Sequence, residues 1–347
     1  MKLLFKFSIM KAIGLYEAHA TDHPDVFYEA DLPLPSATGK DLLVKVKAIG
    51  VNPVDTKVRK SATKKLDEIK VLGWDAVGVV EAIGNNVSLF EVGDEVFYAG
   101  SITRPGSNSD YHLVDERIVG KKPKSLSNLE AAAMPLTTIT AWEALFERLL
   151  ISPKGESSGQ SILIIGGAGG VGSVATQLAK QLAKLNVIAT ASRKETVDWC
   201  KQMGADECIN HHEDLAEQLK AIGYETVDYV LCLNSTDSHW EAIAQIIKPQ
   251  GKICTIVENT GPLAQSVLKQ KSATHVWELM FTKSMYETED MQTQHDLLNQ
   301  AADLFDAGIL KTTLTTDMGE LSVENLANAH AQLESGRTIG KIALSIS

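Results

Sequence analysis

The chain has 347 residues, which is enough for two domains of ordinary size, and 44% of them are hydrophobic, as in globular rather than disordered proteins. It carries 44 acidic and 33 basic residues, so its formal net charge is −11. This balance argues against a nucleic-acid partner, because proteins that bind a phosphate backbone need clustered Lys and Arg.

The N-terminus is basic and apolar and resembles a short signal sequence, but Lys6 and Lys11 interrupt its apolar run and no A-x-A cleavage site follows. Met10 is an equally good natural start. The four cysteines include no C-x-x-C pair and form no disulfide framework, and ordinary packing explains Cys200 and Cys208. No stretch approaches the about 18 apolar residues of a membrane helix. We therefore expect a cytoplasmic protein with reduced thiols and no membrane partner.

The first 135 or so residues are expected to be β-rich and irregular. Short runs rich in β-forming residues are broken by Gly, Pro, Asn and Asp at places typical of turns. The predicted strands in this part lie at 42–49, 77–83 and 96–98.

From about residue 137 the pattern changes to alternating strands and helices. Helices are predicted at 140–150, 171–185 and 196–203, and strands at 161–165, 186–190, 229–233 and 252–257. Strands separated by helices of this length predict right-handed βαβ units and a parallel sheet. The last part of the chain is expected to hold helices at 294–307 and 323–332 and a strand at 341–346.

A glycine-rich loop follows the apolar strand at 161–165 and opens the next helix. Gly167, Gly169 and Gly172 fit G-x-G-x-x-G in the strand–loop–helix context that this fingerprint requires. One glycine allows a tight turn, one lets backbone N–H groups approach a pyrophosphate, and one lets helix and strand pack closely. The helix N-terminus adds partial positive charge. The loop therefore predicts a dinucleotide held by Gly167, Gly169, Gly170, Val171 and Gly172, and the alternative is a glycine-rich turn without a ligand.

The end of the next strand indicates which dinucleotide is preferred. Proteins that prefer NAD usually place Asp or Glu about 20 residues after the loop, to hold the ribose 2′-hydroxyl. This chain instead has Ala191-Ser192-Arg193-Lys194. Ser192 can donate a hydrogen bond to a 2′-phosphate, Arg193 can clamp it, and Lys194 adds charge. The sequence therefore predicts NADPH, and the alternative is that Arg193 and Lys194 lie on a surface turn.

Four segments together resemble one family: Gly50-Val-Asn-Pro-Val-Asp55, the stretch from Gly73 to Gly84, the glycine loop, and Gly340-Lys-Ile-Ala-Leu344. In order and spacing they are similar to the medium-chain dehydrogenase/reductase superfamily, and within it to the zinc-independent quinone oxidoreductases, often labelled zinc-type alcohol dehydrogenase-like. The resemblance runs from about Met10 to the C-terminus. It implies an α/β fold in which a GroES-like β-rich catalytic domain is interrupted by a Rossmann domain with a doubly wound parallel sheet. The implied boundaries are 1–136 for the first part of the catalytic domain, 137–285 for the NADP-binding domain and 286–347 for the return.

The zinc alcohol dehydrogenases of this superfamily carry a cysteine ligand where this chain has Asn52, and Gly-His-Glu where it has Gly73-Trp74-Asp75. They also carry a four-cysteine lobe, and this chain has no cysteine near 90–120. Zinc needs three or four Cys, His or carboxylate ligands at close range, and the nine histidines supply no substitute set. We therefore expect no metal, and we expect Trp74 to be a core residue.

Without zinc to polarise a carbonyl, the substrate must already be electrophilic enough to accept a hydride from NADPH. Quinones and α,β-unsaturated carbonyls (enones) qualify, because charge develops on a conjugated oxygen that needs only hydrogen-bond donors. The sequence therefore predicts a zinc-independent NADPH-dependent quinone or enone reductase, and the resemblance adds a homodimer. The alternatives are an alcohol or carbonyl dehydrogenase of the same superfamily and a non-catalytic NADPH-binding protein similar to the lens crystallins.

The resemblance also implies roles for single residues. Asn52 faces the nicotinamide and the substrate, although its alternative role is to cap a turn with Pro53. Thr138 matches a residue beside the nicotinamide ring. Lys57 is a candidate proton donor, although a solvated lysine is the commoner explanation. Further implied cofactor contacts are the ribose-flanking Leu233 and Asn234, the backbone of Val257 at the carboxamide, and Lys341 at the phosphates.

Overall fold

The computed structural model describes residues 9–347, so most of the N-terminal segment compared above with a signal sequence lies outside the described residues. The chain divides into two compact units. Unit 1 comprises the part of the chain up to Leu136 together with Phe281–Gly308 and Thr312–Ser347. Unit 2 comprises Thr137–Met280 and Ile309–Lys311. Within the described part of the chain, every helix is too short or too polar to cross a membrane.

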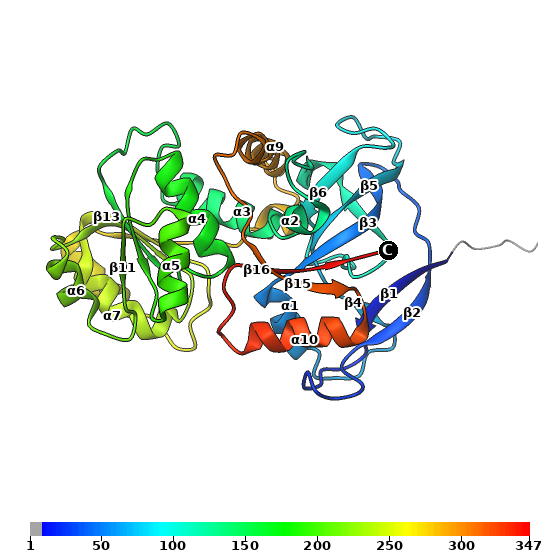
Figure 1. The fold of residues 1–347 in the computed structure, drawn as a ribbon, viewed down its shortest axis with the longest axis horizontal. Coiled ribbons are helices and arrows are strands. Elements are labelled where there is room, and N and C mark those ends of the chain that lie inside the picture. The colour runs from blue at the N-terminus through cyan, green and yellow to red at the C-terminus, as the bar shows by residue number, and fades with distance from the viewer. Residues whose placement is uncertain (1–8) are drawn as a thin grey trace, which may run out of the picture. The chain divides into compact units, whose positions relative to one another are not determined.

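Unit 1 is built on mostly antiparallel sheets (Figure 1). The larger sheet has the strand order β15-β16-β3-β5-β6-β8, with β7 paired to β3, and the smaller one has the order β2-β1-β4. The strands are β1 (Ile9–Leu15), β2 (Tyr28–Pro33), β3 (Asp41–Val51), β4 (Lys70–Val71), β5 (Asp75–Ile83), β6 (Glu95–Ala99), β7 (Tyr111–Asp115), β8 (Val119–Lys121), β15 (Leu314–Glu320) and β16 (Lys341–Ser345).

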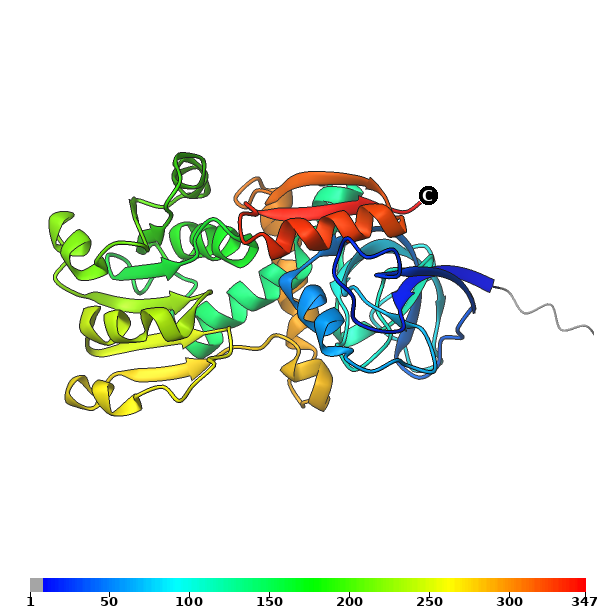
Figure 2. The ribbon, with the colours of Figure 1, turned by 90° about the horizontal axis from the view of Figure 1, so that it is seen from below.

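Two helices of unit 1 begin at recognisable signals. Proline at the first helical position starts α1, where its missing N–H costs nothing. The Ser322 side chain caps α10 by accepting the N–H of Asn325, and α10 packs along β15 and β16 (Figure 2). The helical segments are α1 (Pro53–Ser61), η1 (Glu116–Ile118), α2 (Asn128–Ala132), α8 (Thr282–Tyr286), α9 (Thr293–Asp306) and α10 (Val323–Glu334), and α3 (Pro135–Trp142) begins in this unit and continues into unit 2.

Unit 2 contains a parallel sheet of the order β11-β10-β9-β12-β13-β14, with helices on both faces (Figure 1). The central strand β9 is buried along its whole length, as expected when both faces of a sheet are covered. The strands are β9 (Ser161–Ile165), β10 (Asn186–Thr190), β11 (Glu207–Ile209), β12 (Val227–Cys232), β13 (Ile247–Thr255) and β14 (Thr274–Trp277). The helices are α4 (Gly170–Gln181), α5 (Lys194–Met203), α6 (Leu215–Ala221), α7 (Thr236–Ile246) and the 3₁₀ segment η3 (Gln265–Lys271).

The predicted fold class is confirmed, because a β-rich part is interrupted by a doubly wound parallel sheet. The strands predicted at 161–165 and 186–190 coincide with β9 and β10. The single helix predicted at 140–150 is wrong in type, because α3 ends at Trp142 and continues as the π-helix η2 (Glu143–Arg148). The sequence analysis also missed α6, α7 and β15, whose apolar patterns are short or weak.

Candidate functional site

The glycine loop of unit 2 leads from β9 into α4. Gly166 has a φ of +87°, a conformation that favours glycine. A Cβ atom on Gly172 would lie 2.4 Å from the Gly166 carbonyl oxygen, and one on Gly167 would lie 2.7 Å from Ala189 Cβ. These two positions therefore need glycine for packing. A Cβ on Gly169 would meet only the Gly166 oxygen, at 3.6 Å, so the loop leaves space on this side for a ligand to approach its backbone.

The N-terminus of α4 suits an anion. Gly169 is its N-cap residue, and none of the described side chains caps this end of the helix. The backbone N–H groups of Gly170 and Val171 belong to the first turn, where N–H groups lack intrahelical partners and the helix dipole is positive. The Gly166 N–H donates to Thr190 Oγ1 at 3.0 Å, which ties the loop to β10. The loop residues therefore fit the pyrophosphate of a dinucleotide.

The other residues predicted in unit 2 follow the carboxyl ends of neighbouring strands. Ser192 comes after β10, Leu233 and Asn234 after β12, and Val257 after β13. A Cβ on Gly166 would lie 3.6 Å from Leu233 Cβ and 3.8 Å from Asn234 Cβ, so β12 ends beside the glycine loop. Because β10 and β12 flank β9, the loop lies at the switch point of strand order, where such sheets bind their ligands.

The basic residues after β10 lie at the beginning of α5. Arg193 is its N-cap residue, and its Nε lies 3.2 Å from a Glu195 carboxylate oxygen. Lys194 is exposed and its Nζ contacts Asp198 at 2.5 Å. Ser192 is exposed. The segment presents a hydroxyl and two cations before its first acidic residue, Glu195.

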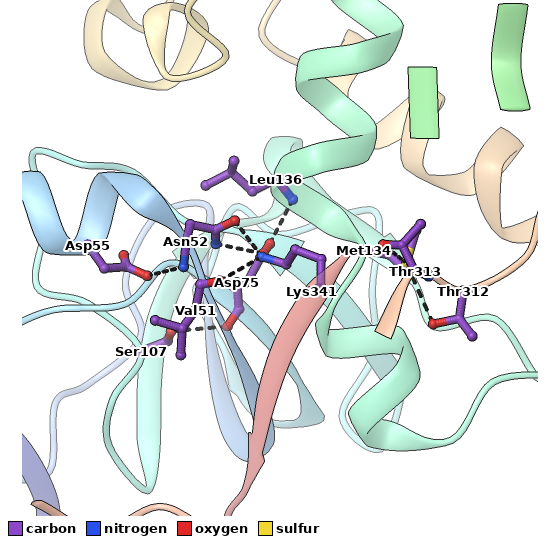
Figure 3. Close-up of polar contacts among 10 residues, drawn as sticks. All are labelled: Val51, Asn52, Asp55, Asp75, Ser107, Met134, Leu136, Thr312, Thr313 and Lys341. Carbon is purple, nitrogen blue, oxygen red and sulfur yellow. Dashed lines mark hydrogen bonds and ion pairs between the residues drawn. The ribbon is translucent and has the colours of Figure 1, made fainter. Parts of the chain in front are cut away.

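Three strands of unit 1 bring Asn52, Asp75 and Lys341 together (Figure 3). The end of β3 lies opposite the beginning of β5 on one side and of β16 on the other, so residues far apart in the sequence become neighbours. Asn52 Nδ2 donates to Asp75 Oδ2 at 2.8 Å. Lys341 Nζ donates to Asp75 Oδ2 and to the Val51 carbonyl oxygen, both at 3.0 Å, and also contacts Asn52 Oδ1. We call Asn52, Asp75 and Lys341 the polar triad.

The three side chains of the triad are buried, and the Lys341 ammonium balances the charge of the Asp75 carboxylate. Asp75 is fully buried, and its second oxygen, Oδ1, accepts the Leu136 N–H at 2.7 Å at the beginning of α3. A buried carboxylate needs this combination of a counter-ion and hydrogen bonds, because removing it from water is costly. Asp75 therefore fixes the Asn52 amide and also satisfies an N–H group at the start of α3.

Asp55 lies next to the triad on α1. The Asn52 N–H donates to Asp55 Oδ2 at 2.6 Å, so the Asp55 side chain reaches back to the N-cap residue while the Asn52 side chain joins the triad. Burial raises the pKa of Asp55 to about 7, although the Asn52 N–H and the Lys341 ammonium pull it down. Its other oxygen, Oδ1, has no hydrogen-bond partner within the described residues.

Three further residues singled out from the sequence differ in burial and hydrogen bonding. Thr138, in unit 2, is fully buried, and its Oγ1 has no hydrogen-bond partner among residues 9–347. Lys57 is exposed on α1. Trp74 is buried and its Nε1 donates to the Ser101 carbonyl oxygen at 3.0 Å, which confirms it as a core residue.

The sequence analysis missed the parts played by Asp75 and Asp55. The sequence indicates Asp75 only as a departure from the zinc ligands, and Asp55 only as part of a family segment. One available signal was the spacing from Asn52 to Asp55, because an acidic residue three positions after an N-cap reaches back to the cap N–H. The pairing of Asp75 with Lys341 had no local signal, since it depends on strand register.

The polar triad does not have the donor set of a zinc site. It offers one amide, one carboxylate and one ammonium, and the ammonium already contacts the other two groups. Within the described residues, no group of three or more His, Cys, Asp or Glu side chains is placed to hold a metal ion.

The sequence and the structure are both similar to known dehydrogenases. Residues 38–124 match the alcohol dehydrogenase GroES-like domain, and residues 203–344 match a zinc-binding dehydrogenase domain. A zinc-type alcohol dehydrogenase-like protein of Staphylococcus epidermidis is 43% identical over 97% of this chain and 100% of its own length. A solved structure from Rhizobium etli CFN 42, described provisionally as a zinc-dependent alcohol dehydrogenase, is 47% identical, with 98% of both chains covered and a TM-score of 0.93. The quinone oxidoreductase of Coxiella burnetii is 28% identical, covers 98% of this chain and 100% of its own, and has a TM-score of 0.81.

Proposed function

Because this chain belongs to the medium-chain dehydrogenase/reductase superfamily, a family of oxidoreductases, we propose that it is a zinc-independent, NADPH-dependent reductase of quinones or α,β-unsaturated carbonyls. The observation that carries the proposal is the contact of the Lys341 ammonium with Asn52 and Asp75, at positions where the zinc enzymes have a ligand cysteine and a glutamate. A cation held between these groups leaves no place for a second one.

The residues of unit 2 bind and orient the cofactor. The loop residues Gly167 to Gly172 hold the pyrophosphate against the N-terminus of α4, and Ser192, Arg193 and Lys194 hold the 2′-phosphate. For this, Arg193 turns its guanidinium from Glu195 toward the stronger dianion. Leu233 and Asn234 flank a ribose, and the backbone of Val257 contacts the carboxamide. The buried, unpartnered hydroxyl of Thr138 is available to hydrogen-bond the nicotinamide. When bound, NADPH supplies the hydride.

The polar triad stabilises the charge that develops on the substrate oxygen. Lys341 has three N–H donors, and they face three acceptors within unit 1, so we propose that it orients Asn52 and neutralises Asp75 rather than contacting the cofactor phosphates. Asn52 Nδ2 uses one of its two N–H groups on Asp75 and has a second for the substrate oxygen. Because Asn52 is held from two sides, this donor is preorganised. Lys57 stays a candidate proton donor for the reduced product.

The remaining proposals concern the whole chain. We propose the domain boundaries 1–136, 137–285 and 286–347, a cytoplasmic location and a homodimer. The dimer is supported by the edge strand β14, beside which the exposed fractions of Trp277 and Leu279 are 46% and 50%.

The test is a comparison of acceptors with the metal removed. The protein is treated with a chelator, and NADPH oxidation is followed with 1,4-benzoquinone, 9,10-phenanthrenequinone and an alkenal, each repeated with NADH. We expect chelator-resistant turnover that prefers NADPH, and the best acceptor distinguishes quinones from enones. Loss of turnover on chelation, with recovery on adding zinc, would favour an alcohol or carbonyl dehydrogenase. Tight NADPH binding without turnover on any acceptor would favour a non-catalytic binding protein.

A further inference from the structure

Two of the four free cysteines meet beneath the glycine loop of unit 2. Cys200 is buried on α5 and Cys208 is half-buried on β11. Both lie at one place behind the loop, because Cys208 is paired in register with Ala189 of β10, and a Cβ on Gly167 would lie 2.7 Å from Ala189 Cβ and 3.2 Å from Cys200 Sγ. Cys208 Sγ also lies 3.9 Å from the Val197 carbonyl oxygen. The other two, Cys232 and Cys254, are buried in β12 and β13.

The thiol pair is physically connected to the loop. A Cβ atom on Gly167 would lie only 3.2 Å from Cys200 Sγ, so this sulfur packs directly behind the first glycine of the fingerprint. The neighbouring Trp199 Nε1 donates to Ser173 Oγ at 2.8 Å, and that hydroxyl donates to the Gly169 carbonyl oxygen at 2.7 Å. A shift of α5 near Cys200 therefore reaches two glycines of the loop.

The two sulfurs differ in access: Cys208 is partly exposed, as an attacking thiol must be, whereas Cys200 is buried and can act only as the resolving thiol. The neighbouring Cys200 thiol and Lys201 lower the pKa of Cys208, against the effect of burial. The neighbouring Cys208 thiol and burial raise the pKa of Cys200. A partly accessible thiol of lowered pKa next to a second thiol is the arrangement that favours reversible oxidation.

We propose that Cys200 and Cys208 form a redox-sensitive thiol pair, that a hydroperoxide oxidises them to a disulfide, and that this disulfide weakens dinucleotide binding. The Cys208 thiolate attacks one peroxide oxygen, the O–O bond breaks, and with one proton this gives the sulfenic acid and water. The Cys200 thiol then attacks the Cys208 sulfur, which forms the S–S bond and releases a second water. Two thiols lose two electrons and two protons, and hydrogen peroxide becomes two waters.

The effect on the loop follows from the distances. A disulfide needs its sulfurs about 2.05 Å apart, much closer than two unbonded thiols approach. Closing the bond therefore moves one or both sulfurs, and because Cys200 Sγ packs directly behind Gly167, a movement of Cys200 disturbs the loop. This second step rests on the proposed dinucleotide site, whereas the formation of the disulfide does not.

The disulfide is tested by peptide mapping. The reduced protein is treated with hydrogen peroxide, its remaining thiols are blocked, and it is digested with trypsin without reduction. Cleavage after Lys201 separates the two cysteines, so a disulfide appears as peptide 195–201 linked to peptide 202–220. We expect this linked pair in the wild type and in the control Cys254→Ala, and its absence in Cys208→Ser. Oxidation of Cys208 to a sulfinic acid without the linked pair would overturn the proposal.

The coupling to the loop is tested on the same samples in two ways. We expect the dissociation constant for NADPH to rise about tenfold on oxidation and to return with dithiothreitol. We also expect the amide hydrogens of the glycine loop to exchange faster in the oxidised protein, which needs no bound cofactor. Unchanged exchange with the disulfide formed would overturn the coupling. Failure of the reduced protein to bind NADPH would instead refute the proposed function and leave the exchange result to decide the coupling.

Discussion

Asp55 is a buried carboxyl group at the beginning of α1, and burial raises its pKa from an ordinary 3.8 to about 7. Between these two values the native state binds a proton that the unfolded state has lost, so this group makes the free energy of unfolding fall as the pH rises. Above about pH 7 the loss is complete. The difference between the two pKa values corresponds to at most ~4 kcal/mol.

We therefore expect Asp55→Asn to gain stability relative to the wild type as the pH rises from about 5 to about 8. Asparagine keeps an oxygen that can accept the Asn52 N–H, so the cap survives. Urea unfolding across this range measures the difference, with the exposed Asp67→Asn as control. Parallel curves for Asp55→Asn and the wild type would mean that Asp55 is ionised throughout.

At the substrate, Asn52→Ala removes the proposed donor to the developing oxygen anion. One such donor contributes about 100- to 1000-fold to turnover in other enzymes, so we expect kcat to fall at least about tenfold. The Michaelis constant for NADPH should stay the same, because the triad lies outside the glycine loop. Steady-state kinetics with saturating acceptor measure both, with the exposed Asn86→Ala as control. An unchanged kcat would leave Asn52 with only a structural role in the polar triad.

At the cofactor, Arg193→Ala removes the proposed clamp on the 2′-phosphate. We expect the Michaelis constant for NADPH to rise by roughly 10- to 100-fold, which corresponds to charge-assisted hydrogen bonds of ~1.5–3 kcal/mol. The constant for NADH should change little, because NADH lacks this phosphate. Lys201→Ala removes a positive charge from the same helix and is the matched control. Equal effects of Arg193→Ala on both cofactors would contradict the assignment.

At the scale of the elements, two glycines of the loop have different roles: Gly169 is proposed to leave space for the ligand, whereas Gly172 is needed for packing. At Gly169, φ is −74° and ψ is 175°, which any residue adopts, and a Cβ there has space. We expect Gly169→Val to keep the melting temperature and to abolish NADPH binding, because the side chain occupies the space for the pyrophosphate. Gly172→Val should instead lower the melting temperature, since its Cβ would overlap the Gly166 oxygen. Fluorescence titration with NADPH and thermal unfolding distinguish the two. Retained affinity in Gly169→Val would refute the role of the loop.

Local pattern predicted the elements of unit 2 better than those of unit 1. The strands β9 and β10 are continuous apolar runs, and their ends coincide with polar residues or glycine, so they could be placed to the residue. The π-helix at Glu143–Arg148 could not be foreseen, because its sequence is also a good α-helix and the wider turn depends on tertiary packing.

The polar triad shows why the site could be predicted only in part. Asn52 was found through its family segment, but its neighbours Asp75 and Lys341 are 23 and 289 residues away and meet it through the register of three strands. The same limit applies to Cys200 and Cys208, whose contact depends on how α5 packs against β11.

On the scale of the whole molecule, the chain leaves unit 1 and returns to it. A short segment within the return packs with unit 2, and one side chain binds it there. Ile309–Lys311 joins unit 2, although it lies between two segments of unit 1. Gln177 on α4 holds it, because Gln177 Nε2 donates to the Lys311 carbonyl oxygen at 3.1 Å and Gln177 Oε1 accepts the Lys311 N–H at 2.7 Å. The amino-acid composition of this segment does not predict its hydrogen bonds with Gln177.

We propose that the homodimer forms through β14, the edge strand of the parallel sheet. Strand β14 pairs only with β13 within the described residues, and an unpaired edge with exposed Trp277 and Leu279 is suited to pairing with a second copy. We expect light scattering to give about twice the 37.6 kDa of one chain. The double variant Trp277→Glu with Leu279→Glu should be monomeric, because four like charges would meet across a two-fold interface. Val92→Glu, at an exposed apolar residue of unit 1, should stay dimeric. A dimer that survives the double variant would place the interface elsewhere, and a monomeric wild type would refute the dimer.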